Sequence, residues 1–124
     1  MRTENGVQYG DLLGFVDFDY LARVTRYNAA TLAALALAPT PPKTSVDTKA
    51  LTNDTTLFWD TVPRAVRYEV VRRASTEPTW TSVQDVGDVT RVTLPFSKDN
   101  WQFGVRSVDA QGHRSPAAYP TPAR

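Results

Sequence analysis

The sequence contains no cysteine and only one histidine among its 124 residues. Without cysteine the chain has no disulfide, no thiolate metal ligand and no thiol nucleophile. A single histidine also leaves no combination of nucleophile, general base and orienting group from which a hydrolytic site is assembled. We therefore expect no catalytic residue, no bound metal ion and no cofactor in this chain.

The sequence also lacks an excess of charge and a long apolar run. It contains 14 Lys and Arg residues and 13 Asp and Glu residues, so its net charge is +1. This charge does not favour a nucleic acid partner. The apolar run over 29–38 is far shorter than the roughly 18 residues of a membrane span, and the N-terminus has no export signal. With 41% hydrophobic residues, the composition suits one modest globular core.

The stretch VDFDYLARVTRYNAATLAALALA predicts one long helix over 17–38. Asp17 is a suitable N-cap, and Asp19 adds negative charge in the first turn; this explains the pair more simply than a metal site does. The apolar positions at helical spacing that we predict to form an interface are Leu21, Val24, Leu32 and Leu35. Because the second half of this helix is apolar nearly all round, it needs a partner surface.

Downstream of residue 43 the apolar spacing changes from the helical period to two. Short runs rich in β-branched and aromatic residues, such as TTLFWD, RYEVVRR, TRVTLP and WQFGVRSVD, alternate with turn sequences. Strands spaced in this way are typical of an antiparallel β-sandwich. The side chains predicted to form its core are Trp59, Tyr68, Val92, Phe103 and Val105.

The prolines of PTPPK separate the helix from the sandwich, because proline cannot continue a helix. Together with the start of the helix, they divide the chain into four segments. We expect a flexible N-terminal segment over 1–16, the helix over 17–38, a proline-rich linker over 39–43 and the sandwich over 44–122. The fold class is therefore mainly β, a sandwich preceded by one long helix.

Two residues outside the predicted core are weak candidates for ligand contacts. His113 lies in DAQGHRS, at the tip of a predicted hairpin, and is either a ligand contact or general base, or a solvated loop residue, which we favour. Trp80 lies in EPTWTSV and is either a platform for sugar or peptide, or an edge aromatic that covers the core, which we favour. Arg72 and Arg73 must point to opposite faces of a strand, which argues against one basic patch.

The order of LFWD, YEVVRR, VTLP and FGVRSVDAQGHRSP resembles a fibronectin type III domain over roughly Pro41 to Pro122. That resemblance implies an immunoglobulin-like sandwich. One position departs from the family pattern, since Trp101 stands where a tyrosine normally makes the corner before a late strand. An indole N–H cannot copy the phenolic hydrogen bond, so we expect this corner to be built differently.

The helix and linker, VDFDYLARVTRYNAATLAALALAPTPPK, resemble the last helix of the catalytic domain in bacterial zinc-dependent aminopeptidases of metallopeptidase family twenty-eight. Some members of that family carry such a sandwich after this helix. The resemblance implies a two-zinc peptide hydrolase upstream, with a periplasmic or secreted location for the parent protein. Its last zinc-binding histidine would precede the helix, where NGVQYGDLLGF contains none.

Two functions remain open from the sequence. On the first, the chain is a non-catalytic C-terminal accessory domain of a zinc aminopeptidase, and the upstream catalytic domain is its partner. On the second, it is an independent β-sandwich that binds protein or carbohydrate. The helix favours the first, because an autonomous binding module has no use for a fully apolar helix face. In isolation, that face is expected to drive self-association.

Overall fold

The computed structural model describes residues 2–123, which fall into two compact units that divide between Ala33 and Ala34. The first unit holds the N-terminal hairpin and most of the long helix, and the second holds the sandwich. Each unit is described by itself.

The first unit opens with a hairpin of β1 (Arg2–Glu4) and β2 (Val7–Tyr9), which pair antiparallel. Asn5 and Gly6 form its turn with positive φ angles of 48° and 79°, the backbone that an Asn-Gly hairpin turn requires. A short 3-10 helix, η1 (Leu13–Phe15), follows. The Asn-Gly turn signal thus gives this segment local secondary structure, and its expected flexibility stays a prediction.

The long helix α1 spans Phe18–Leu37 and crosses the division between the units. Asp17 caps it, since its Oδ1 accepts a hydrogen bond of 2.9 Å from the backbone N–H of Tyr20. Asp19 adds a negative charge in the first turn, where the helix dipole favours it. None of the residues of α1 is buried.

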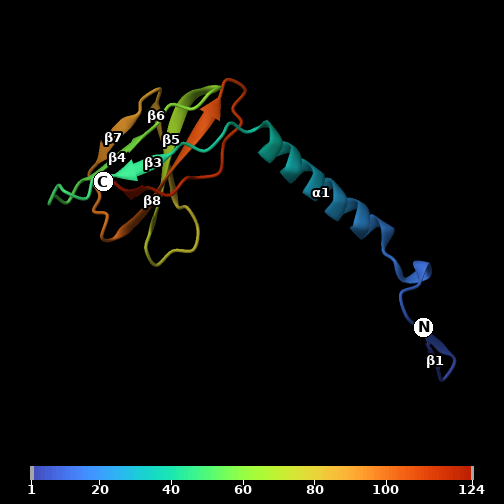
Figure 1. The fold of residues 1–124 in the computed structure, drawn as a ribbon. Helices are drawn as coiled ribbons and strands as arrows, with labels where there is room; N and C mark the ends of the chain where they lie inside the picture. The colour runs from blue at the N-terminus through green and yellow to red at the C-terminus, as the bar shows by residue number, and fades with distance from the viewer. Residues whose placement is uncertain (1, 124) are drawn as a thin grey trace. The chain divides into compact units, whose positions relative to one another are not determined.

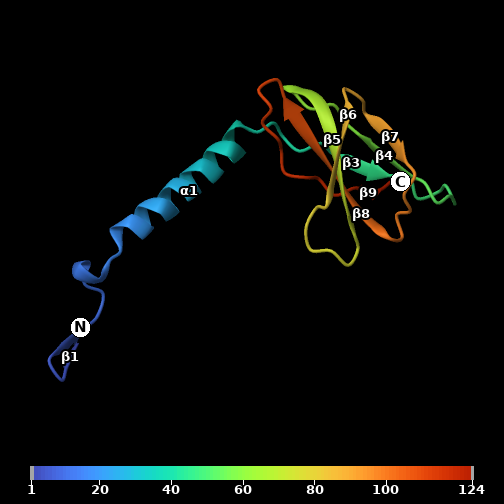
Figure 2. The same ribbon diagram turned by 180° about the vertical axis from the view of Figure 1, so that it is seen from behind.

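The second unit is a sandwich of two sheets, which Figures 1 and 2 show from opposite sides. One sheet has the strand order β7-β4-β3-β9 and the other β6-β5-β8. The strand bounds are β3 Thr44–Val46, β4 Thr55–Trp59, β5 Ala65–Ala74, β6 Ser82–Gly87, β7 Arg91–Leu94, β8 Trp101–Asp109 and β9 Thr121–Pro122. The predicted fold class, a mainly β sandwich after one long helix, is confirmed.

One strand pair departs from the expected antiparallel pattern. After β8 the chain turns back and runs beside that strand through the bridges Val108↔Arg114 and Val105↔Ala118. It then crosses to the other sheet, where β9 pairs with β3 in parallel. The parallel pair therefore forms because the last segment of the chain pairs first with β8 of one sheet and then with β3 of the other.

The core between the sheets contains four of the five side chains predicted for it, namely Trp59, Tyr68, Phe103 and Val105. Val92 packs against this core but is only half-buried. Its strand, β7, lies at an edge of its sheet, where a side chain has neighbours on one side only. The prediction for Val92 was therefore too strong.

The corner before β8 is held by rings and a cation. Trp101 meets Phe96 edge to face with ring centroids 5.5 Å apart. The Arg72 guanidinium lies 3.8 Å from the Phe96 ring centroid and 5.5 Å from that of Trp101. Arg73, its neighbour in the chain, lies instead over the ring of Trp80, as strand alternation predicts.

Candidate functional site

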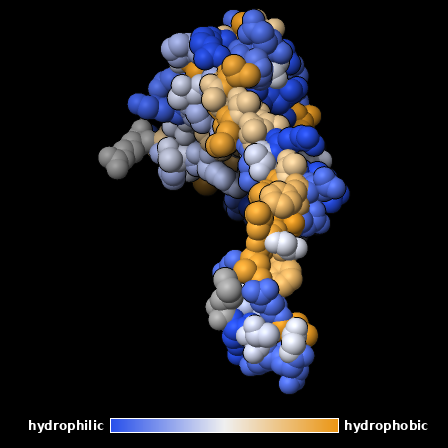
Figure 3. All heavy atoms as spheres, turned by 90° about the vertical axis from the view of Figure 1, so that its right-hand side faces the viewer, coloured by the Kyte–Doolittle hydropathy of each residue, from blue (hydrophilic) through white to orange (hydrophobic). Residues whose placement is uncertain are grey.

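Exposed apolar side chains are concentrated between residues 7 and 37. Figure 3 shows apolar residues covering the visible part of α1, whereas the sandwich surface is mostly hydrophilic. We call the exposed large apolar residues of this region the N-terminal apolar surface; they are Val7, Tyr9, Leu13, Phe15, Val16, Phe18, Tyr20, Leu21, Tyr27, Leu32, Leu35 and Leu37. Such a concentration marks an interaction surface.

The predicted interface residues lie within this region. Leu21, Leu32 and Leu35 are at least half exposed, at 50%, 67% and 54%, and Val24 is half-buried. Polar side chains such as Arg23 and Arg26 occupy other positions on the helix circumference. The assignment of these four residues to an interface stays a prediction.

His113 lies near the tip of the hairpin after β8 and contacts a buried carboxylate. Its Nδ1 lies 2.9 Å from Oδ2 of Asp109, and its backbone N–H donates to Oδ1 at 2.9 Å. The backbone N–H of Gln111 donates to the same Oδ1 at 2.9 Å. Asp109 is only 2% exposed, so these donors replace the water that its carboxylate loses.

The pKa of Asp109 reflects two opposing effects. Burial alone raises it, but the hydrogen bonds from the His113 ring and from the backbone N–H groups of His113 and Gln111 outweigh burial and lower the pKa to about 2. The carboxylate is therefore ionised at neutral pH and is fully engaged in shaping the hairpin. This arrangement explains His113 as part of a structural anchor.

Arg64 extends the Asp109 cluster to the end of α1. Its guanidinium NH2 lies 3.4 Å from Asp109 Oδ2 and donates a hydrogen bond of 2.7 Å to the carbonyl oxygen of Leu37. Arg64 itself has a φ of 70°, in the left-handed region that residues other than glycine rarely adopt. Nearby, the Ser107 hydroxyl donates to the carbonyl oxygen of Thr40 at 2.7 Å.

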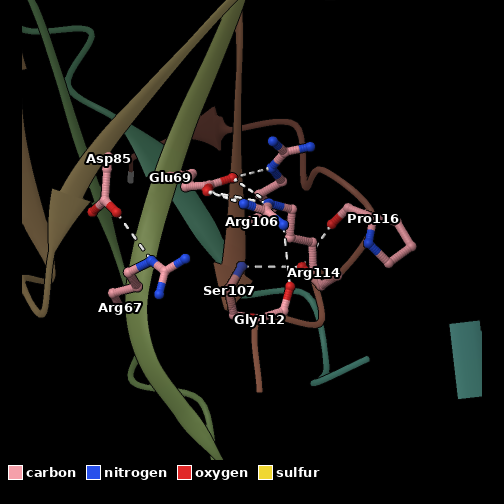
Figure 4. A network of polar contacts seen from close by, with 9 residues as sticks. Arg67, Glu69, Asp85, Arg106, Ser107, Gly112, Arg114 and Pro116 are labelled. Atoms are coloured by element: carbon pink, nitrogen blue, oxygen red, sulfur yellow. Dashed lines mark hydrogen bonds and ion pairs between the residues drawn. The ribbon is translucent and has the colours of Figure 1, made fainter. Parts of the chain in front are cut away.

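A second polar network covers the outer face of the three-stranded sheet. Figure 4 shows Glu69 between the guanidinium groups of Arg106 and Arg114. Arg106 Nε lies 2.6 Å from one carboxylate oxygen, and Arg114 Nε lies 3.2 Å from both oxygens. Burial raises the pKa of Glu69, but the hydrogen bonds from Arg114 and Arg106 outweigh it and leave the pKa below its usual value.

Trp80 lies over the same sheet and covers it. Its ring lies against that of Tyr119 in a tilted arrangement, with centroids 5.3 Å apart and planes inclined by 38°. A Cβ added at Gly104 would come within 3.2 Å of the Trp80 ring and 3.1 Å of Val71, so glycine makes this close approach possible. The geometry fits an edge aromatic that shields the sheet.

A hollow of about 530 Å³ lies beside Tyr119. The rings of Phe58 and Tyr119 help line it, and Lys43 and Asp60 add opposite charges. A hollow of this volume and mixed polarity suits a small ligand or a peptide side chain. It is the feature that an independent binding module would use.

Among residues 2–123, no group of three or more His, Asp or Glu side chains is placed to hold a metal ion. Within the same residues, no helix has the length and apolar character needed to cross a membrane.

Lowering the pH from about 5 to about 2 is expected to destabilise the sandwich. Asp109, with a pKa of about 2 against an ordinary value of 3.8, and Glu69, with a pKa below 4.5, both bind protons more readily when unfolded. Their contribution is thus present above pH 5 and is lost as the pH falls through their folded pKa values. Urea denaturation at pH 6, 4 and 3 measures this; Asp109→Asn should show a weaker pH dependence, and an equal one would contradict the assignment.

The chain is similar in sequence to probable zinc metalloproteases of several fungi. It is 52% identical over 98% of its length to a probable zinc metalloprotease of Leptosphaeria maculans, 48% identical over 99% to one of Pyrenophora teres f. teres and 45% identical over 98% to one of Pyricularia oryzae. The chain spans 29%, 26% and 25% of these relatives. No protein-family profile matches it.

Solved structures support the fold. The sandwich is similar to an Fn3-like protein from Clostridium thermocellum, with a TM-score of 0.56 and 20% identity over 70% of this chain and 96% of that one. It is also similar to a myokine structure, with a TM-score of 0.50 and 17% identity over 69% of this chain and all of that one. At these identities the likeness shows a fibronectin type III-like fold alone.

The comparisons support the zinc-protease part of the sequence resemblance and leave its finer parts open. The matched relatives are fungal rather than bacterial, and their names do not specify an aminopeptidase. The sequence analysis did not find the Asp109 and Glu69 networks. One signal was available, because an aspartate that directly precedes a turn, as Asp109 does in DAQGH, typically accepts a hydrogen bond from the backbone N–H two residues further on.

Proposed function

We propose that this chain is the non-catalytic C-terminal part of a longer zinc-dependent peptidase, and that the catalytic domain packs on the N-terminal apolar surface. The observation that carries the proposal is the concentration of exposed apolar side chains between residues 7 and 37, in a chain that spans 25–29% of three probable zinc metalloproteases. Burying each large side chain of this kind contributes roughly 1.5–3 kcal/mol, so an unpartnered surface of this size is costly.

The first unit then belongs to the catalytic domain rather than to the sandwich. A lone two-stranded hairpin is marginally stable in water, and all six residues of β1 and β2 are exposed. Packing against a larger domain supplies the apolar contacts that the hairpin, η1 and α1 lack within their own unit. The sandwich has a core of its own and needs no such support.

The resemblance to metallopeptidase family twenty-eight supplies the finer proposal. On it, the parent enzyme is an aminopeptidase of the periplasm or the extracellular space, and its zinc ions are held by residues before this chain. The sandwich supports the catalytic domain or shapes substrate access. The hollow beside Tyr119 is the feature that would instead serve an independent module for protein or carbohydrate.

Two truncations of the Leptosphaeria maculans relative test the proposal. One ends at the position matching Ala38 and removes only the sandwich; the other ends at the position matching Val16 and removes α1 as well. We expect the first to remain soluble and to keep its zinc-dependent peptidase activity to within about tenfold, and the second to aggregate or lose activity, because α1 completes the catalytic domain. Equal solubility and activity of both truncations would contradict the proposal and favour the independent module.

A further inference from the structure

The proline-rich segment after α1 is docked on the sandwich at several points. Pro39 and Pro42 are buried, although the segment contains no regular secondary structure. The carbonyl oxygen of Thr40 accepts a hydrogen bond of 2.7 Å from Ser107, whose side chain lies in β8 and is fully buried. The linker expected over 39–43 is therefore part of the packed second unit.

The last turn of α1 is exposed but is hydrogen-bonded to the sandwich through Arg64. A helix ends with four carbonyl groups that have no partner within the helix. The guanidinium of Arg64 supplies a donor to one of them, the Leu37 carbonyl, at 2.7 Å. A cation at a helix C-terminus also opposes the negative end of the helix dipole.

The position of Arg64 is determined by its surroundings on two sides. On one side the turn before β5 is held because the Tyr68 hydroxyl accepts the backbone N–H of Val62 at 2.8 Å. On the other side the guanidinium lies 3.4 Å from the buried carboxylate of Asp109, which His113 and the hairpin backbone hold in place. A residue other than glycine keeps a φ of 70° only where neighbouring contacts impose it.

We propose that Arg64 and Ser107 form a latch that fixes the last turn of α1 and the proline-rich segment to the sandwich, with Asp109 and His113 orienting Arg64. The proline-rich segment is then docked on the sandwich within the second unit and is not a flexible tether. This role rests on the proposed function, since it defines how the sandwich is joined to the helix on which a catalytic domain packs.

Arg64 and Ser107 differ in exposure, so their contributions to the stability of the latch should differ. The side chain of Arg64 is 60% exposed, so water competes for its contacts. Ser107 is fully buried, and its removal would leave the Thr40 carbonyl without its donor. Neither Arg64 nor Ser107 belongs to the sandwich core.

Hydrogen exchange on the intact chain tests the latch. In Arg64→Gly, glycine tolerates the positive φ, so the variant removes the guanidinium without straining the turn. We expect the backbone amide of Ala38, which donates to Ala34 at 3.2 Å, to exchange about five- to tenfold faster. Ser107→Ala should accelerate by a similar or larger factor the amide of Asp60, which donates to the carbonyl oxygen of Lys43 at 3.2 Å and so reports the docking of the segment. In both variants the amides of β5 and β8 should keep their protection.

Arg91→Ala is the matched control, because it also removes an exposed arginine but lies in β7. It should leave the exchange of Ala38 and Asp60 unchanged. The latch is refuted if Ala38 exchanges equally fast in Arg64→Gly and in the unmodified chain, or if all sandwich amides accelerate together. Because this experiment uses only the present chain, its outcome is separate from that of the truncations that test the proposed function.

Discussion

Replacing Leu32 and Leu35 together by aspartate is expected to convert a self-associating chain into a monomer. Both leucines are more than half exposed on α1, at 67% and 54%, within the N-terminal apolar surface. In the isolated chain, two copies of that surface recover part of the free energy of burial by packing on each other. We therefore expect a dimer or larger oligomer at concentrations on the order of tens of micromolar.

The double substitution should weaken association by about 100-fold or more. Each leucine contributes roughly 1.5–3 kcal/mol when buried, and an unpaired carboxylate at the interface adds a further penalty. Light scattering after size exclusion measures the change, and circular dichroism should show that the sandwich stays folded. A tenfold change in a dissociation constant corresponds to about 1.4 kcal/mol, so a 100-fold weakening requires the loss of only about 2.8 kcal/mol of association free energy.

A matched control uses the opposite face of the same helix. Ala30→Asp with Ala33→Asp introduces the same charges at the same spacing, about half a turn away from the leucines. It should leave the oligomer largely intact, because alanines contribute little buried area. If the unmodified chain is monomeric at high concentration, or if both double variants dissociate equally, the leucine stripe is not the associating surface.

Much of the sandwich could be predicted from the sequence, because local chemistry and tertiary packing favour the same structure there. Alternating apolar residues in β4, β5 and β8 place Trp59, Tyr68 and Phe103 on one face, where the core forms. The N-cap at Asp17 could also be predicted, since capping depends on a few neighbouring residues. The burial of Val92 was overestimated, because alternation shows which face of a strand a side chain lies on but not whether the strand is at the edge or the centre of the sheet.

The polar networks could not be predicted, because they join residues that only the topology brings together. Glu69 and Arg106 face each other across β5 and β8, and the register that pairs them is set by long-range contacts. Arg64 meets Leu37 and Asp109 only after the sandwich has closed. The sequence shows these residues as ordinary surface charges, and three-dimensional pairing makes Asp109 and Glu69 buried polar groups.

The position of the Glu69 network explains why a charged group is buried there. Val70 points into the core, so Val71 points to the outer face of the same sheet, and Val108 of β8 lies on that outer face too. Both valines are fully buried although neither belongs to the core between the sheets. The ion pairs of Glu69 with Arg106 and Arg114, together with Trp80, therefore act as a cover that keeps water from this second apolar layer.

Glu69→Gln is accordingly expected to destabilise the sandwich by about 3 kcal/mol, at the low end of the range for breaking a buried ion pair. The amide keeps the shape of the side chain but leaves Arg106, whose side chain is 23% exposed, without its counter-charge. Arg114 is 47% exposed and can turn to water, which limits the loss. Chemical denaturation at pH 7, followed by tryptophan fluorescence, measures the change in the free energy of unfolding.

Asp85→Asn is the matched comparison, because it neutralises a carboxylate in the same sheet with the same kind of isosteric change. Asp85 pairs with Arg67 at 3.0 Å, but its side chain is 54% exposed. Ion pairs with a partner exposed to this degree contribute about 1 kcal/mol or less, since water competes with Arg67 for the carboxylate of Asp85. A loss for Glu69→Gln no larger than that for Asp85→Asn would mean that Val71 and Val108 stay dry without the ion pairs, and that the network is a surface feature and not a cover.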